Sequence, residues 1–225
     1  MATERTATKA RRIRRLPSDA EREILDAAEA VLAERPYRDM SVDELMRRTG
    51  MTRSTFYHYF RSLDEVAIAL MRRVQGEMMD VAMPWIDAGH DEDPVASVPR
   101  AIRAVAEIYA RHGRVLAAIH EASFHHEAVQ QAWREGILED WIRAIAEQLS
   151  AQRERGVTRV RNAPEIARAL LLMNTSVFVE RLGQKQPPDS AESVADTLSE
   201  IWVGAIYPEA LAEQRASRPR RRTTP

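Results

Sequence analysis

The 225-residue sequence contains no cysteine, which excludes disulfide bonds and thiolate metal sites and agrees with a cytoplasmic protein. Glycine is scarce, with 8 residues, and strand-type alternation of apolar and polar residues is missing. No run approaches 18 apolar residues, so no membrane-spanning helix is expected. The basic N-terminus lacks the apolar segment of a secretory signal. Plentiful alanine and aliphatic residues, with charged residues at 30%, instead predict an all-α protein.

The formal net charge of −1 conceals a strong asymmetry along the chain. Residues 1–17 contain six basic side chains and one acidic one, and residues 215–225 contain five arginines and no acid. The sequence between them carries a formal charge of −11. We expect a disordered basic arm at 1–17, suited to phosphate contacts, and a disordered basic tail at 209–225. The alternative is that both ends are disordered in solvent and bind no partner.

The most informative segment spans residues 41–60, SVDELMRRTGMTRSTFYHYF, which predicts two short helices joined by a glycine turn. Ser41 is placed to cap the first helix, and Glu44 completes a capping box three residues later. Gly50 is suited to end that helix because glycine adopts positive φ without a Cβ clash. Thr52 is the expected N-cap of the second helix. This order is typical of a helix-turn-helix that reads DNA, and the alternative is an ordinary helical hairpin.

The second of these helices, expected over residues 53–59, carries groups suited to DNA. Hydroxyl and basic side chains gather at its N-terminus, where free backbone N–H groups and the helix dipole favour phosphate. Arg53 can pair with guanine or hold a phosphate, and the sequence leaves both open. Phe56 and Phe60 are spaced to pack inward. The candidate DNA-binding residues are Ser41, Thr52, Arg53, Ser54, Thr55, Tyr57, His58, Tyr59 and Arg61.

Apolar residues recur at helical spacing through the rest of the chain. A first helix is expected at 18–34 and a long connecting helix at 63–84. Five more are expected near 95–112, 114–126, 128–154, 164–182 and 190–206, which gives about nine helices in all. The predicted organisation is a helix-turn-helix DNA-binding domain at 18–62 and a C-terminal ligand-binding and dimerisation domain at 63–208.

Residues 18–70 resemble the DNA-binding domain of TetR-family repressors. The resemblance rests on a capped first helix, the short helix S-V-D-E-L, the segment G-M-T-R-S-T-F-Y-H-Y-F and a long helix led by acidic residues. In the C-terminal half, A-L-x-L-M-N at 169–174 and D-T-L-x-x-I-W-V-x-x-I-Y at 196–207 are similar to the EthR-like repressors of that family. Leu63 departs from the family, whose members usually have a lysine there that contacts a DNA phosphate. Arg61 is the hypothetical replacement for that contact.

The resemblance implies a homodimer that places two recognition helices in successive major grooves of a palindromic operator, about 34 Å apart. It also implies that a ligand in the C-terminal domain alters this separation through the connecting helix. Dimers of the family form through the last two helices, here near 164–182 and 190–206. Apolar residues on these helices fit an interface, or alternatively fill the monomer core. They are Leu170, Val177, Val194, Leu198, Ile201 and Val203.

A ligand site is expected in the C-terminal part, which contains all four tryptophans and several other large apolar residues. Such side chains line apolar pockets, and the alternative is aromatic core packing. Asn174 is a candidate polar anchor, because a buried amide must meet a ligand or an internal partner. The resemblance favours Trp133, Asn174 and Trp202 and implies a lipophilic small-molecule effector, without a cofactor. The candidate lining residues are Tyr109, Phe124, Trp133, Trp141, Met173, Asn174, Phe178 and Trp202.

Three functions remain in competition: a ligand-responsive transcriptional regulator, an architectural DNA-binding protein without a ligand, and a helical enzyme or metal protein. A metal site could draw on Glu121 and His125, which are four residues apart, but the spacing H-E-x-x-H and a third ligand are missing. No phosphate-binding glycine loop or Ser–His–Asp set is evident, so neither a metal nor an enzymatic activity is expected. The aromatic C-terminal half favours the first function, with repression of an operator by a dimer.

Overall fold

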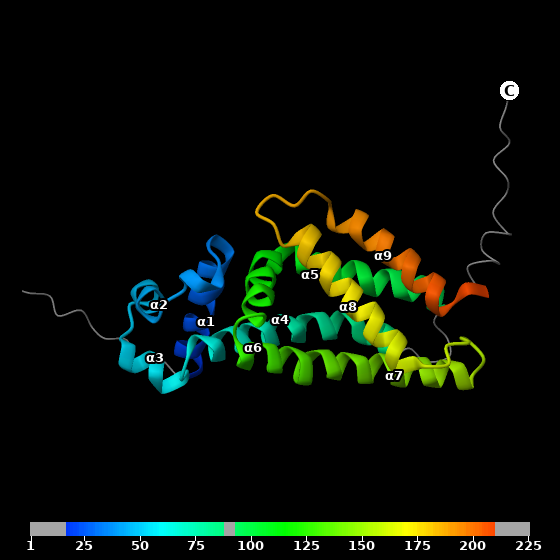
Figure 1. Ribbon diagram of the computed structural model, residues 1–225, viewed down its shortest axis with the longest axis horizontal. Helices are drawn as coiled ribbons and strands as arrows, with labels where there is room; N and C mark the ends of the chain where they lie inside the picture. Colours follow the sequence, from blue (N-terminus) through cyan, green and yellow to red (C-terminus); the bar gives the residue numbers. More distant parts are fainter. Residues whose placement is uncertain (1–16, 88–92, 210–225) are drawn as a thin grey trace, which may run out of the picture.

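The computed structural model describes residues 17–87 and 93–209 (Figure 1). The expected basic arm and basic tail lie outside these residues, apart from Pro17 and Glu209. Within the two described ranges all regular structure is helical and no strand occurs. The predicted all-α fold is therefore confirmed. None of the helices in these ranges is long and apolar enough to cross a membrane.

Three helices form the N-terminal domain: α1 (Pro17–Glu34), α2 (Val42–Thr49) and α3 (Arg53–Tyr59). A 3-10 turn at Tyr37–Asp39 connects the first two. Their shared core consists of fully buried side chains, among them Ile24, Leu45 and Phe56. This core includes side chains of α4, α5 and α6, so the helix-turn-helix is held against the adjoining helices, and α3 lies at one end of the molecule (Figure 1).

The connecting helix α4 (Leu63–Ile86) leads from this domain into the C-terminal one (Figure 1). The following helices are α5 (Pro94–Ser123), α6 (Glu127–Gln131), α7 (Glu139–Glu154), α8 (Ala163–Leu182) and α9 (Ala191–Ile206). A π-helical segment at Ala132–Leu138 joins α6 to α7. Helix α5 is central, because it packs against α4, α8 and α9.

The number of helices differs slightly from the expected nine. α6, the π-helical segment and α7 follow one another without a break, as predicted for 128–154, so the described residues form eight continuous helical runs. The two helices expected near 95–112 and 114–126 form the single helix α5, because Gly113 lies inside it and does not end a helix. A Cβ at Gly113 would overlap the backbone carbonyl of Leu182, so this glycine permits close approach of α5 and α8. Pro84 likewise lies inside α4, two residues before its end.

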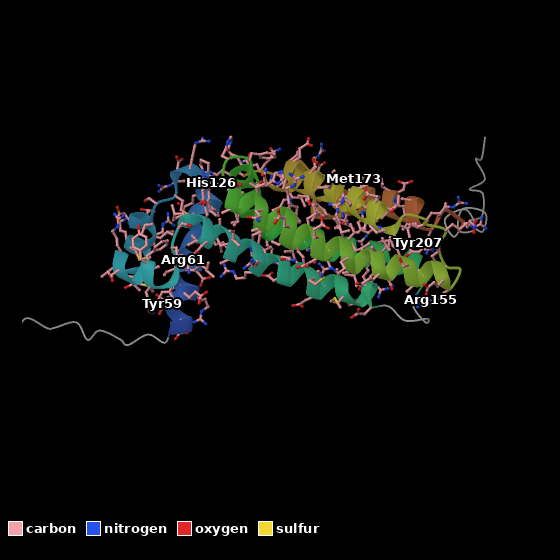
Figure 2. All side chains as sticks on the ribbon, turned by 60° about the horizontal axis from the view of Figure 1, so that its bottom comes forward. Tyr59, Arg61, His126, Arg155, Met173 and Tyr207 are labelled. Carbon is pink, nitrogen blue, oxygen red and sulfur yellow. The ribbon has the colours of Figure 1, made fainter. Side chains whose placement is uncertain are left out.

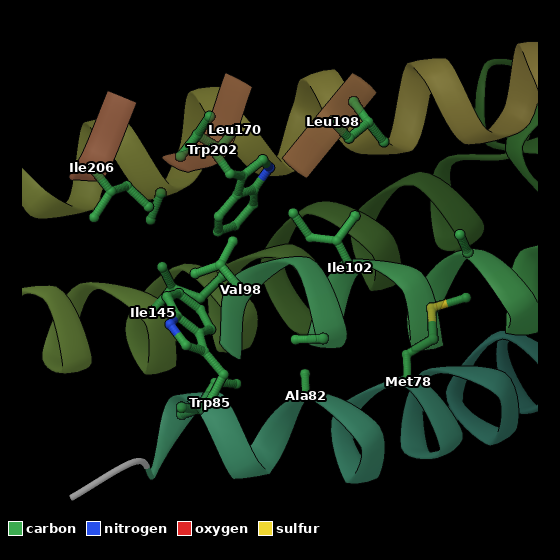
Figure 3. Close-up of a cluster of buried hydrophobic side chains, with 14 of the residues drawn as sticks. Met78, Ala82, Trp85, Val98, Ile102, Ile145, Leu170, Leu198, Trp202 and Ile206 are labelled. Carbon is green, nitrogen blue, oxygen red and sulfur yellow. The ribbon is translucent and has the colours of Figure 1, made fainter. Parts of the chain in front are cut away.

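Most apolar residues proposed for the dimer interface are used inside the monomer. Leu170, Val194, Leu198 and Val203 are all buried in the C-terminal core. Figure 3 shows Leu170 and Leu198 there. The alternative interpretation, core packing, therefore applies to these four. Val177 is half-buried, and Ile201 is 43% exposed.

Candidate functional site

Helix α3 is held in place by capped ends and buried aromatic side chains. The Ser41 hydroxyl accepts a hydrogen bond from the Glu44 backbone N–H at 3.3 Å, and Gly50 ends α2 with a φ of 66°. The Thr52 hydroxyl accepts from the Thr55 backbone N–H at 3.2 Å and so caps α3. Phe56 is fully buried in the domain core. These contacts leave the opposite side of α3 free to face DNA.

The structure divides the candidate DNA-binding residues into two groups. Thr55 and Tyr59 are half-buried, and Tyr59 packs against the core of the N-terminal domain. The Thr55 hydroxyl lies 3.0 Å from that of Thr52. Figure 2 shows Tyr59 and Arg61 at the end of the molecule that the N-terminal domain forms. The exposed residues are Ser41, Thr52, Arg53, Ser54, Tyr57, His58 and Arg61.

Arg53 carries a surface ion pair in this structure. Its Nη1 donates to the Asp43 carboxylate at 3.0 Å, and both side chains are largely exposed. Hydrogen bonding to Tyr57 raises the pKa of Arg53, with a further contribution from the charge of Asp43. Exposed pairs of this kind contribute little to stability, because water screens the two charges. Arg53 can therefore leave Asp43 for a phosphate or a guanine at little cost.

The arginines at the end of α2 are engaged within the domain. The Glu44 carboxylate accepts hydrogen bonds from Arg47 at 2.7 Å and from Arg48 at 2.9 Å. Arg48 also donates to Glu34 of α1 at 2.8 Å. Hydrogen bonds from Arg48 and then Arg47 lower the pKa of Glu44 to about 2. Ser41 performs its half of the predicted capping box, whereas the Glu44 carboxylate binds these two arginines within α2, and the bond from Arg48 to Glu34 ties α2 to α1.

Leu63, which occupies the usual lysine position, packs half-buried against the N-terminal core. Its side chain is therefore directed to packing and offers no phosphate contact. Arg61 is 92% exposed, and its Nε lies 3.9 Å from the Glu65 carboxylate. At that distance and exposure the guanidinium is accessible to a DNA phosphate.

Two polar clusters that sequence reasoning missed join the domains. The Tyr37 hydroxyl donates to Asp64 at 2.5 Å, and Nδ1 of His126 lies 3.0 Å from the same carboxylate oxygen. On the other side of α4, Glu29 of α1 lies 2.7 Å from Nδ1 of His112 in α5. The partners are 27 to 83 residues apart in sequence, so no local pattern could reveal them. In the described part of the chain, no group of three or more acidic, histidine or cysteine side chains could hold a metal ion.

The C-terminal domain contains a cavity of about 100 Å³. Its lining is mostly apolar and comes from α4, α5, the π-helical segment, α7, α8 and α9. Figure 3 shows Trp85 of α4 and Trp202 of α9 pointing toward each other, and their ring centroids are 5.8 Å apart. Tyr109 stacks on Phe178 at 4.6 Å, and burial raises the pKa of Tyr109 to about 12. The cavity is therefore an aromatic, water-poor space.

Six of the eight candidate ligand residues line this cavity: Tyr109, Trp133, Trp141, Asn174, Phe178 and Trp202. The structure does not bring the other two to it. Phe124 follows the end of α5 and is 66% exposed. Met173, labelled in Figure 2, is only half-buried and packs against the edge of the core. The Asn174 Oδ1 accepts a hydrogen bond from the Trp202 indole N–H at 2.9 Å, so one half of its amide has an internal partner.

Helix α4 supplies lining residues absent from the candidate list, including Met78, Ala82 and Trp85 (Figure 3). They follow Met71 and Gln75 at alternating spacings of four and three. That helical periodicity was the signal that could have assigned this face of α4 to the cavity. The same helix begins at Leu63, and only residues 60–62 separate it from the end of α3 at Tyr59, so one helix joins the cavity wall to α3.

Comparisons with known proteins agree with this geometry. Residues 24–70 match the family described as bacterial regulatory proteins of the tetR family, and residues 98–208 match the C-terminal domain of the transcriptional regulator EthR. The HTH-type transcriptional regulator EthR of Mycobacterium tuberculosis (strain CDC 1551 / Oshkosh) is 34% identical over 196 residues, covering 86% of this chain and 90% of that protein. The chain belongs to the TetR family. EthR of Mycolicibacterium smegmatis is 30% identical to this TetR-family chain over 197 residues, covering 84% and 87%.

Solved structures of TetR-family proteins share the fold. A regulator from Syntrophomonas wolfei superposes with a TM-score of 0.72 at 12% identity, over 84% of this chain and 96% of that one. A transcriptional regulator from Saccharomonospora viridis, solved in complex with choline, has a TM-score of 0.64 at 19% identity, over 84% and 98%. The chain is therefore a TetR-family transcriptional regulator of the EthR type, as its motifs predicted.

Proposed function

We propose that the protein represses transcription by binding a palindromic operator as a dimer, through the exposed side of α3. The observation that carries this proposal is the arrangement of α3. Thr52, Arg53, Ser54, Tyr57 and His58 are exposed together, while Phe56 on the same helix is fully buried. Regulators of the TetR family bind operator DNA and usually act as dimers with small-molecule effectors. The protein would act on chromosomal DNA in the cytoplasm, and we assign it no catalytic step.

We further propose that a lipophilic effector occupies the cavity and moves α4. An apolar lining with few polar groups favours such a molecule. Met78, Ala82 and Trp85 contribute one wall from α4, so an occupant bears directly on the helix that continues from α3. Asn174 is the candidate polar anchor inside the cavity, through the half of its amide that Trp202 does not use. An architectural protein without a ligand is not favoured, because it would have no use for this space.

The dimer is proposed to form through α8 and α9. Small or apolar residues are exposed on both helices, including Ala169 and Ser176 on α8 and Ile201 and Ala205 on α9. Small side chains let helices of two subunits approach closely. Sedimentation of the Ile201→Glu variant tests the interface, since a charge there should convert the dimer to a monomer. A variant that remains fully dimeric would place the interface elsewhere.

Operator recognition is tested with duplexes enriched from a random pool by binding to the protein. We expect an inverted repeat and a loss of affinity for Arg53→Ala, measured by fluorescence anisotropy. A loss confined to one base position indicates pairing with guanine, and a uniform loss indicates a phosphate contact. Arg143→Ala is the matched control, because Arg143 also forms an exposed ion pair, with Asp140 of α7. Equal affinities of the Arg53 and Arg143 variants for every duplex would refute the proposal for α3.

A further inference from the structure

A second, smaller hollow adjoins the cavity. That hollow has a volume of about 30 Å³ and shares Tyr109, Trp133 and Thr175 with the cavity. It also shares His120, Ser123 and Trp133 with a surface depression of about 720 Å³. The three spaces therefore adjoin one another, and the Trp133 side chain borders all of them.

The depression has a mixed lining, in which polar and charged side chains outnumber apolar ones. Phe124 is 66% exposed and Leu172 is 45% exposed, and both line it. They are two of the five large hydrophobic residues exposed in the described part of the chain. Two of its five charged side chains, Arg168 and Glu139, pair with each other at 2.8 Å. This surface is therefore suited to a molecule that has both an apolar chain and a polar head group.

An irregular helical segment borders the narrow part between the depression and the cavity. Trp133 belongs to the π-helical segment 132–138, and π-helical turns often occur at functional sites. Its side chain is only half-buried. Gly136 in the same segment has open space where a Cβ would stand, so the segment is not tightly packed at that point. A change of the Trp133 rotamer would widen the connection without disturbing the helices around it.

His120 supplies a polar group at this narrow part. Its imidazole borders both the small hollow and the depression, and it meets the Phe124 ring edge-on at 5.2 Å. Within the described residues, neither ring nitrogen has a hydrogen-bond partner. Burial lowers the pKa of His120, which keeps the ring neutral at neutral pH. A neutral imidazole can donate one hydrogen bond to a carbonyl oxygen, and it offers no positive charge to a carboxylate.

We propose that the depression is the entrance of the cavity, that Trp133 closes it, and that it admits unbranched single-chain molecules with a neutral carbonyl head group, which His120 binds. An ester or amide with its chain in the cavity fits this arrangement. The inference rests on the proposed function, since it takes the cavity to be the effector site.

The route is tested by blocking the rim. Because the chain has no cysteine, a Phe124→Cys variant can be labelled at that position alone with a maleimide-linked polyethylene glycol. The association rate of octanamide is measured by stopped-flow tryptophan fluorescence. It should fall at least about tenfold after labelling. Val157→Cys, at an exposed position that does not line the depression, is the matched control and should show no change on labelling. If labelling of Phe124→Cys left the association rate of octanamide unchanged, the proposed entrance would be refuted, but the effector site would not. Failure of the unlabelled protein to bind octanamide or octane would overturn the proposed effector site as well.

The head-group contact is tested with His120→Ala and with the two ligands octanamide and octane. In His120→Ala, loss of one hydrogen bond should lower the affinity for octanamide about tenfold and change the affinity for octane by less than about twofold. His120→Gln, which retains a donor, should restore part of the octanamide affinity. Equal losses for both ligands, or none for octanamide, would overturn the role of His120.

Discussion

Two glycines in long helices should respond to alanine with opposite signs. Gly113 is buried in α5 at its closest approach to α8, and a Cβ there would overlap the Leu182 carbonyl. Gly76 is exposed in α4, and nothing lies within 4 Å of the position of a Cβ. The intrinsic helix preference of alanine over glycine, about 1 kcal/mol, is the same at both sites. The sign of the result therefore depends on the helix contact alone.

At Gly76 only the helix preference operates, so Gly76→Ala should stabilise the protein by about 1 kcal/mol. At Gly113 the overlap involves backbone, which cannot rotate away, and overpacking of this kind costs about 1–3 kcal/mol. Subtracting the helix gain leaves Gly113→Ala destabilised by up to about 2 kcal/mol. For a chain of this size, that shifts the melting temperature down by about 4–8 °C, measurable by calorimetry. A Gly113→Ala variant as stable as Gly76→Ala would refute the close approach of α5 and α8.

Three further predictions concern single side chains. Arg61→Ala should weaken operator binding evenly across sequences and reduce the salt slope by about 1, and an unchanged slope would exclude a phosphate contact. The folded pKa of Glu44, about 2, lies below its ordinary value of 4.5, so Glu44 contributes stability above pH 4.5 that is lost as the pH falls toward 2. Glu44→Gln should therefore flatten the decline in urea stability over that range, whereas an identical decline would contradict the pairing with Arg48. Asn174→Leu leaves the Trp202 N–H without its acceptor and should cost about 1–3 kcal/mol in chemical denaturation, while a neutral result would argue against that bond.

The helix-turn-helix could be predicted from sequence because its determinants are local. Ser41 and Thr52 cap through groups three residues away, and Gly50 adopts the left-handed conformation that its lack of a side chain permits. Such contacts depend on neighbours along the chain and need no knowledge of the fold.

The prediction of a helix break at Gly113 was wrong, because this glycine is required by the packing of α5 against α8, which depends on the tertiary fold. Glycine is as compatible with a helix end as with close helix packing, and only the position of α8 distinguishes the two. The same holds for Leu170 and Leu198, whose apolar character fits a dimer interface or a monomer core equally well. Periodicity identifies the apolar face of a helix, but it does not identify the partner of that face.

The aromatic residues of the cavity could be listed from sequence, but their arrangement could not. Phe124 and Trp133 have similar character, yet one lies on the surface and the other borders the interior space. The contribution of α4 was missed because Met78 and Ala82 lack the aromatic character on which the list was based. The clusters around His126 and His112 depend on residues brought together only by the tertiary fold.

The central claim is that occupancy of the cavity alters the affinity of α3 for its operator, and one measurement tests it most directly. The dissociation constant of the full-length protein for its selected operator is measured by anisotropy with and without saturating octanamide. We predict that octanamide weakens operator binding by at least about fivefold, and that operator DNA weakens octanamide binding by the same factor, since such coupling is reciprocal. Octanamide that binds the protein but leaves operator affinity unchanged would contradict the claim.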